Sequence, residues 1–138
     1  MNYEPTDGGR ASYAPNEKRD CTVRAFAIVC GLPYAESHSI LKDAGRKNQH
    51  GVHFDTVLKI IGWRYRLKRR NDTDTTLRGF VEAHPTGRYV VLVREHALAL
   101  VDGTLHDTLS PTPRSRVRGA WELDRPVPVN DRWVTSPA

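Results

Sequence analysis

Apolar residues occupy almost every face of one short segment near the start of the chain, residues 20–31. In a helical projection these residues form two apolar groups, Val23, Phe26, Ala27 and Cys30 on one side and Ala25, Ile28, Val29 and Leu32 on another. Asp20 precedes the run as a helix N-cap, and Gly31 follows it as a helix stop. Mainly Thr22 and Arg24 remain to face water. A helix that is apolar nearly all round is buried, so the pattern predicts a short core helix.

Three further segments space their apolar residues as helices do. The predicted helices run over residues 34–44, about 53–61 and 76–83. Pro33 is well placed to open the first of these, and Gly45 to close it. Gly62 is the expected end of the second helix.

The remaining periodic segments alternate as β-strands do. Residues 63–69 alternate large apolar and basic side chains, and so many charges favour an edge position. A further strand is predicted over 117–123. Segments rich in β-forming residues, separated by tight turns, lie at 88–93, 96–101 and 104–108. Helices followed by a mostly antiparallel sheet predict an α+β fold, with N-terminal helices packed on the sheet.

A chain of 138 residues fits one domain, and no internal repeat is visible. Residues 1–15 are polar and show no periodicity, so we expect an N-terminal arm that is mobile or laid over the surface. Residues 16–124 form the expected core. Residues 125–138 are Pro-rich and form a tail that is able to cross the sheet once through Val127, Val129 and Trp133.

Composition points to a globular protein in the cytoplasm. Hydrophobic residues make up 38% of the chain, yet no run approaches the eighteen or so needed to cross a membrane. The N-terminus lacks the basic and apolar regions of a signal peptide. Cys21 and Cys30 would lie roughly 13 Å apart along one helix, too far to be bridged, so we expect reduced thiols.

The net charge of the chain is +5, and basic residues cluster in two segments, 64–70 and 114–118. Such groups attract nucleic acid or an acidic protein partner, and they are also the ordinary composition of a solvated surface. No recognisable nucleic-acid module accompanies them. An acidic protein or a nucleic acid thus remain as the two alternative partners of this basic surface. We expect no membrane partner, because no apolar run is long enough to cross a membrane.

Cys21 stands in the first turn of the predicted core helix. Backbone N–H groups point outward there and the helix dipole is positive, which favours a thiolate over a thiol. Cys21 is therefore a candidate nucleophile. The alternative interpretation is a plain core helix in which Cys21 is a small, inert buried residue.

A cysteine nucleophile needs a base, and the base needs a third group to orient it. His96 opens one predicted strand and Asp107 closes the next. If Asp102 and Gly103 are the central residues of the turn, paired residue numbers sum to 205, and His96 and Asp107 share one face as diagonal neighbours. A slip of one residue would place them on opposite faces. Asp102 is a rival for the orienting role, but turn geometry already explains it.

The other histidines combine less well with neighbouring groups. His50 and His53 could share a helix face as metal ligands, but only Asp55 is near them, so polar loop positions are the preferred interpretation. His38 is expected on a partly exposed helix face, and His84 at a helix end. His106 should point away from Asp107 by strand alternation. We expect no metal and no cofactor.

Taken together, Asp20-Cys21 at the head of a buried helix, His96-Ala97-Leu98-Ala99, and Asp102-Gly103 followed by Asp107 resemble the papain-like cysteine peptidase superfamily. The likeness is closest to its compact bacterial and phage branches, among them bacteriocin-leader-processing peptidases and effector proteases that carry a His-Ala-x-Ala strand. It spans residues 16–108 and implies the papain-like fold.

The resemblance also implies roles for the residues. Cys21 would attack an acyl carbon, His96 would hold it as a thiolate–imidazolium pair and protonate the leaving group, and Asp107 would orient His96. In that family a Gln or Asn shortly before the cysteine helps to form the oxyanion hole. Asn16 is the matching residue here, although the family usually has Gln one position farther back; a turn residue is its alternative role.

The leading hypothesis is thus a cytoplasmic thiol hydrolase that cleaves a peptide, isopeptide or related amide bond in a peptide or protein substrate. Its location would be the host cytoplasm if the chain is phage-encoded. A cysteine acyltransferase or deamidase would use the same three residues. A non-catalytic binding protein that uses the basic surface is the hypothesis from a different class.

Overall fold

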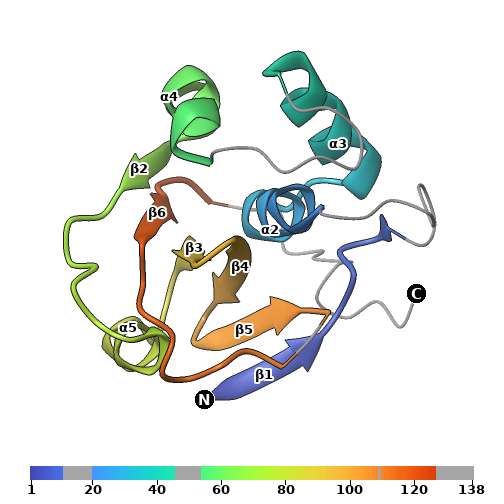
Figure 1. Ribbon diagram of the computed structural model, residues 1–138. Coiled ribbons are helices and arrows are strands. Elements are labelled where there is room, and N and C mark those ends of the chain that lie inside the picture. The colour runs from blue at the N-terminus through green and yellow to red at the C-terminus, as the bar shows by residue number, and fades with distance from the viewer. Residues whose placement is uncertain (11–19, 46–53, 109, 127–138) are drawn as a thin grey trace.

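The computed structural model describes residues 1–10, 20–45, 54–108 and 110–126, and a six-stranded mixed sheet forms its centre (Figure 1). The strand order is β1-β5-β4-β3-β6-β2. The strands are β1 (Asn2–Pro5), β2 (Leu67–Arg69), β3 (Arg88–Val93), β4 (His96–Val101), β5 (Thr104–Asp107) and β6 (Gly119–Leu123). β1 pairs parallel with β5, and the other neighbours pair antiparallel. The expected α+β class and mostly antiparallel sheet are confirmed.

Helices cover both faces of the sheet. α2 (Cys21–Cys30) packs on one face against β4, β3 and β5, and α3 (Tyr34–Asp43) packs on α2. α4 (Phe54–Tyr65) contacts α2 through the edge-to-face rings of Tyr65 and Phe26 and leads into β2. α5 (Leu77–Ala83) packs on the other face (Figure 1). Because side chains alternate along each strand, the sheet has two separate apolar clusters.

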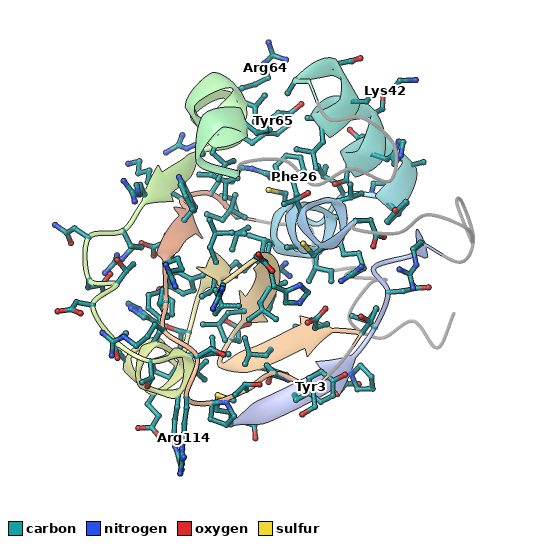
Figure 2. The ribbon with its side chains drawn as sticks, in the orientation of Figure 1. Tyr3, Phe26, Lys42, Arg64, Tyr65 and Arg114 are labelled. Carbon is teal, nitrogen blue, oxygen red and sulfur yellow. The ribbon has the colours of Figure 1, made fainter. Side chains whose placement is uncertain are left out.

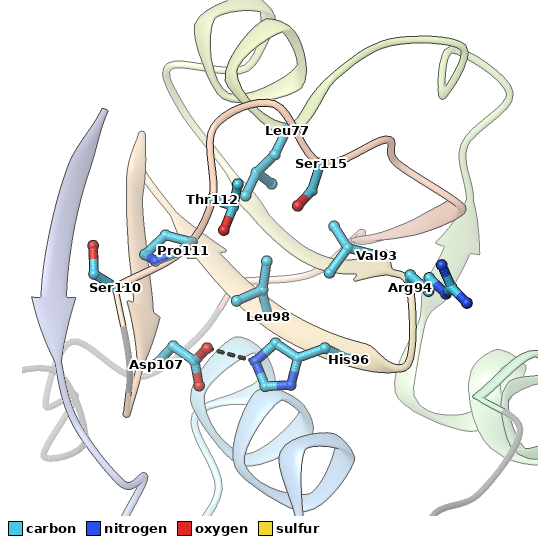
Figure 3. Close-up of a pocket in the computed structure, with 10 residues that line it drawn as sticks. All are labelled: Leu77, Val93, Arg94, His96, Leu98, Asp107, Ser110, Pro111, Thr112 and Ser115. Carbon is cyan, nitrogen blue, oxygen red and sulfur yellow. Dashed lines mark hydrogen bonds and ion pairs between the residues drawn. The ribbon is translucent and has the colours of Figure 1, made fainter.

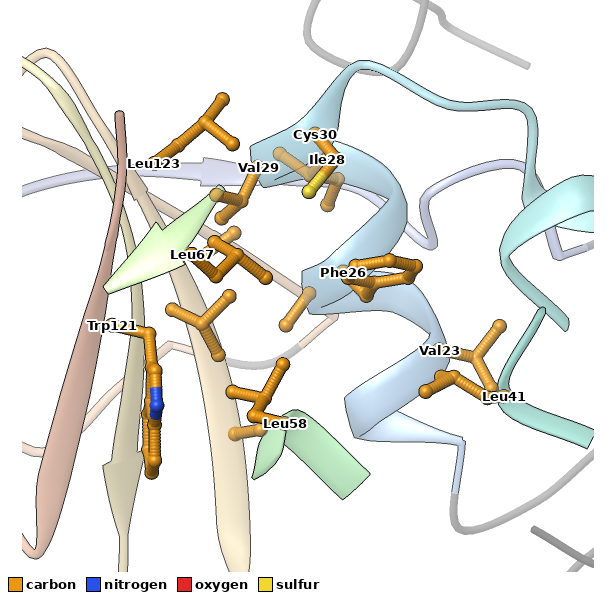
Figure 4. Packing of buried hydrophobic residues seen from close by; sticks show 14 of the residues in the cluster. Val23, Phe26, Ile28, Val29, Cys30, Leu41, Leu58, Leu67, Trp121 and Leu123 are labelled. Atoms are coloured by element: carbon orange, nitrogen blue, oxygen red, sulfur yellow. The ribbon is translucent and has the colours of Figure 1, made fainter. Parts of the chain in front are cut away.

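The larger cluster surrounds α2 (Figure 4). Phe26 and Val29 are fully buried there, between the sheet and the neighbouring helices. Leu58 of α4, Leu67 of β2 and Trp121 of β6 come from the sheet side of the helix (Figure 4). The prediction that α2 is a buried core helix is confirmed, and Gly31 ends it in the left-handed conformation, with φ of 65°.

The two polar positions of this helix do not meet water as expected. Thr22 and Arg24 are both buried, with 5% and 7% of their surface exposed. The expectation was wrong because helical spacing alone says nothing of what other segments lie over a helix. Arg24 is tolerated in the interior because two carboxylates pair with it, Asp20 and Asp107.

The first residues of the chain were expected to form an arm that is mobile or laid over the surface, and the structure instead has a strand there. Residues Asn2–Pro5 form β1 and extend the sheet beside β5. A four-residue edge strand with three exposed side chains has no apolar alternation to reveal it, and its stability comes from backbone pairing with β5. Residues 11–15 and the predicted tail positions Val127, Val129 and Trp133 lie outside the described residues.

The predicted stop at Gly62 was wrong. α4 continues to Tyr65, and the chain reverses at Arg66, which has a positive φ of 60°. Gly62 serves close packing instead, since a Cβ there would come within 3.2 Å of the Leu67 carbonyl oxygen. The predicted strand 63–69 is therefore shortened to β2, although its edge position is confirmed.

Candidate active site

The β4–β5 hairpin places His96 and Asp107 at the same end of the sheet. Val101 pairs with Thr104, and Ala99 with His106, so paired residue numbers sum to 205 as the turn predicted. Asp102 and Gly103 both have positive φ, at 47° and 80°, which is the geometry of a two-residue hairpin turn. The predicted register is thus confirmed. His96 and Asp107 lie two residues from Leu98 and Leu105, which face α5, so strand alternation directs both toward that side. They stand at the end of the sheet, where Cys21 and Arg24 of α2 also reach them.

His96 and Asp107 form a direct ion pair across this hairpin. His96 Nε2 lies 2.5 Å from Asp107 Oδ2, a short charge-assisted hydrogen bond (Figure 3). The hydrogen bond to Asp107, together with a second one to Cys21, raises the pKa of His96 to about 9. Burial raises the pKa of Asp107, but the hydrogen bond and charge of His96, the Thr108 backbone N–H and the charge of Arg24 together hold that pKa below its ordinary value.

Cys21 is the first residue of α2 and lies against this pair. Burial raises the pKa of the Cys21 thiol, but hydrogen bonds from His96 and from the Ala97 backbone N–H, with the positive charges of His96 and Arg24, lower it below the ordinary value. Nε2 of His96 faces Asp107, so the other ring nitrogen is the one left for the sulfur. The structure therefore brings together the three side chains that the sequence singled out.

Cys30 provides the contrast within the same helix. It is 1% exposed, and burial raises the pKa of its thiol to about 12 despite the nearby charges of Arg125 and Arg88. An ordinary core cysteine at this depth is held as the neutral thiol. The two thiols, nine residues apart, differ because Cys21 is paired with His96 and is less deeply buried than Cys30.

Four further contacts fix the position of Asp107. Its Oδ1 accepts the Thr108 backbone N–H at 2.8 Å and lies 3.2 Å from Arg24 Nη2. Its backbone oxygen accepts the Thr6 N–H at 2.9 Å and the Tyr3 hydroxyl at 3.2 Å. Tyr3 belongs to β1 and Thr6 directly follows it, so the N-terminal segment fixes the main chain of Asp107.

Arg24 joins Asp107 to the start of the nucleophile helix. Its Nη1 pairs with Asp20 Oδ1 one helical turn earlier, and Asp20 also accepts the Tyr34 hydroxyl at 2.9 Å. Asp20 is fully buried. Sequence reasoning missed this chain of contacts, although an Asp and an Arg spaced i,i+4 in an otherwise apolar helix were the available signal.

Asp20 occupies the N-cap position but does not act as a cap. Its side chain accepts no hydrogen bond from the helix amides, so the capping role predicted for it was wrong. The amides of Cys21, Thr22 and Val23 have no acceptor within the helix itself, because they belong to its first turn. Amides in the first turn of a helix are the backbone groups that bind anions. Asn16, the second donor expected from the sequence, lies outside the described residues.

The other histidines in the described part of the chain, His38, His84 and His106, have other surroundings. His38 is buried, contrary to the partly exposed position expected for it, because α3 packs it against Tyr34. His84 ends α5 as predicted and bonds Asp72 at 2.9 Å. His106 is buried, and burial lowers its pKa. Within the described residues no group of three or more His, Cys, Asp or Glu could hold a metal ion, and His50 and His53 lie outside them.

A pocket of about 290 Å³ opens beside His96 on the α5 side of the sheet (Figure 3). His96 and Asp107 lie at one end of it. Its walls combine apolar side chains with hydroxyl groups, namely Leu77, Val93, Leu98 and Pro111 with Ser110, Thr112 and Ser115. Arg94 lies at its margin (Figure 3).

Comparisons with family models, with curated proteins and with solved structures find no match to this chain.

The basic groups are partly neutralised by neighbouring carboxylates. Lys68 pairs with Asp124 at 2.7 Å, and Arg70 pairs with Glu122 at 2.7 Å and with Asp72. Arg116 lies 2.7 Å from Asp74. Arg64 and Arg114 extend outward from opposite sides of the molecule (Figure 2). In the residues that the structure describes, no helix is long and apolar enough to cross a membrane.

Proposed function

We propose that this protein is a thiol hydrolase with a papain-like arrangement of fold and active site, in which Cys21, His96 and Asp107 form the catalytic triad. The observation that supports it is the hydrogen-bonded series from Cys21 to His96 to Asp107, with the pKa of Cys21 lowered despite its burial. A nucleophile, a base and an orienting carboxylate in contact are what acyl transfer through a cysteine requires.

In the proposed reaction, the Cys21 thiolate attacks the carbonyl carbon of an amide and forms a C–S bond. The His96 imidazolium donates its proton to the leaving nitrogen as the C–N bond breaks. Water then attacks the thioester, His96 accepts the water proton, and the C–S bond breaks to restore the thiolate. The N–H groups at the start of α2 stabilise the oxyanion in both steps.

Asp107 keeps the base in the productive state. As a carboxylate bonded to Nε2, it directs the other ring nitrogen toward Cys21 and favours the imidazolium form. The raised pKa of His96 and the lowered pKa of Cys21 define a range in which the thiolate and the imidazolium coexist. Above about pH 9, loss of the His96 proton is expected to lower turnover.

The test is the pH dependence of Cys21 alkylation by iodoacetamide, followed by mass spectrometry of the modified peptide. We expect Cys21 to react with an apparent pKa well below about 8.5, and to lose this advantage in His96→Ala. In that variant burial is left to oppose ionisation, so the apparent pKa should rise. Asp107→Asn should shift it in the same direction.

Two controls accompany this experiment. Cys30 reports within the same molecule and should stay unmodified in the folded protein. Asp72→Asn removes the carboxylate of the other Asp–His pair, that of Asp72 and His84, and should leave Cys21 unchanged. If Cys21 titrates as an ordinary thiol both in the unmodified sequence and in His96→Ala, the triad is not formed and the proposal is wrong.

A further inference from the structure

The pocket beside His96 belongs to only one side of the triad. His96 and Asp107 line it, and Cys21 does not. Leu77 and Leu98, which also line it, belong to the apolar cluster on the α5 side, whereas Cys21 packs against the cluster around α2. His96 therefore contacts both the nucleophile and the pocket.

If Cys21 attacks an acyl carbon, as proposed above, the position of the pocket indicates which part of the substrate it contacts. The acyl part of a substrate becomes bonded to the sulfur, and the departing group takes its proton from His96. A departing group must therefore lie closer to His96 than the acyl group does. A pocket that touches His96 and not Cys21 is placed for the leaving-group side.

The lining determines which group the pocket would accept. Among the lining residues that the structure describes, four side chains are apolar, and the three hydroxyl groups are uncharged. Its carboxylate, Asp107, already pairs with His96 and Arg24 and is 4% exposed. Arg94 lies at the margin and directs its guanidinium away from the other lining side chains, so the imidazolium of His96 is the positive charge at the pocket itself (Figure 3). A cation entering the pocket would meet this charge and, among the described lining residues, no free carboxylate, so an uncharged apolar group is favoured.

We infer that this pocket is a specificity site, resting on the proposed function, which accepts an uncharged apolar side chain on the leaving-group side of the scissile bond and rejects a cationic one. Its volume of about 290 Å³ is at the small end of ligand-binding pockets and suits one side chain.

Two thioester probes with the same acyl group test this inference. The acetylglycine thioester of 3,3-dimethylbutanethiol carries an apolar leaving group, and that of thiocholine carries a cationic leaving group of nearly the same shape. The Cys21 thiolate attacks the carbonyl, a new thioester forms at Cys21, and the old C–S bond breaks to release the thiol, which takes its proton from His96. Each rate is divided by the rate with free N-acetylcysteine to remove intrinsic reactivity.

We expect a preference of at least about tenfold for the apolar probe, the size of discrimination that one apolar contact region provides. Ser115→Leu partly fills the pocket and should reduce this preference by lowering the rate with the apolar probe. Arg94→Glu reverses the marginal charge and should reduce it by raising the rate with the cationic probe. Ser39→Leu, at an exposed position on α3, should change neither rate.

Iodoacetamide alkylation of the same variants separates the two proposals. If Cys21 is alkylated as a low-pKa thiol but shows no preference, or keeps its preference in both pocket variants, or accepts neither thioester, the pocket inference is wrong and the triad stands. If Cys21 lacks the low-pKa reactivity in the unmodified sequence, both proposals fall together.

Discussion

Arg24 compensates two buried carboxylates at once, those of Asp20 and Asp107. Replacing Arg24 by Met keeps a long apolar stem and removes the charge, which leaves both carboxylates without this cation. We expect the free energy of unfolding at pH 7 to fall by about 3–5 kcal/mol, the usual cost of breaking a buried ion pair. Urea unfolding followed by circular dichroism measures this loss.

The matched control is Arg78→Met, which breaks the exposed i,i+4 pair with Glu82. Exposed pairs of this kind contribute about 0.5 kcal/mol or less, so the variant should be nearly neutral. Equal effects of the two variants would contradict the interior role of Arg24.

The difference in the free energy of unfolding between the unmodified protein and Arg24→Met should depend on pH. Because the folded-state pKa of Asp107 lies below its ordinary value, its ionisation stabilises the fold above the unfolded pKa, near 4. That contribution is lost as the pH falls through the lower, folded value. The deficit of Arg24→Met should therefore shrink between about pH 4 and more acidic conditions.

At the scale of elements, the parallel β1–β5 pair connects the first residues of the chain with the active site. β1 covers the edge of β5, and Thr6 and Tyr3 bind the Asp107 carbonyl oxygen. Without β1, the strand that carries Asp107 becomes an edge strand with unpaired backbone groups.

Deletion of residues 1–6 tests this connection. We expect faster hydrogen exchange at the amides of residues 104–107, and a shift of the Cys21 alkylation pKa toward that of an ordinary thiol, since Asp107 is less well held. Glu4→Gln, at an exposed position of β1, is the control and should leave both measurements unchanged. Unaltered exchange in β5 after the deletion would show that β1 does not support it.

On the scale of the whole molecule, the two thiols report different parts of the structure. Cys30 lies in the cluster that joins α2, α3, α4 and the sheet, whereas Cys21 lies at the end of the sheet and is partly exposed. A domain of this size commonly unfolds in one cooperative transition. Access to Cys30 should then require global unfolding.

Pulsed thiol labelling along a urea titration measures this difference. We expect labelling of Cys30 to follow the midpoint of the circular dichroism transition, and labelling of Cys21 to occur already in the folded protein. Cys30→Ala serves as the control for peptide assignment. Labelling of Cys30 well before the main transition would show that the α2 cluster opens on its own.

Local patterns were sufficient for the parts of the fold that depend on neighbouring residues. The Asp102-Gly103 turn sets the hairpin register, and that register alone brings His96 and Asp107 within reach of each other. The buried helix of residues 21–30 and its end at Gly31 follow from apolar content and from the backbone freedom of glycine.

The tertiary structure decided what depends on distant segments. Arg24 is buried because Asp107, far along the chain, arrives beside it, and residues 2–5 become a strand because β5 offers an unpaired edge. Asp20 binds Arg24 and Tyr34 in preference to capping its own helix. The sequence by itself determined local conformation and the candidate chemistry of Cys21, His96 and Asp107. Their protonation preferences depend on burial and on partner charges, which only the folded chain brings together.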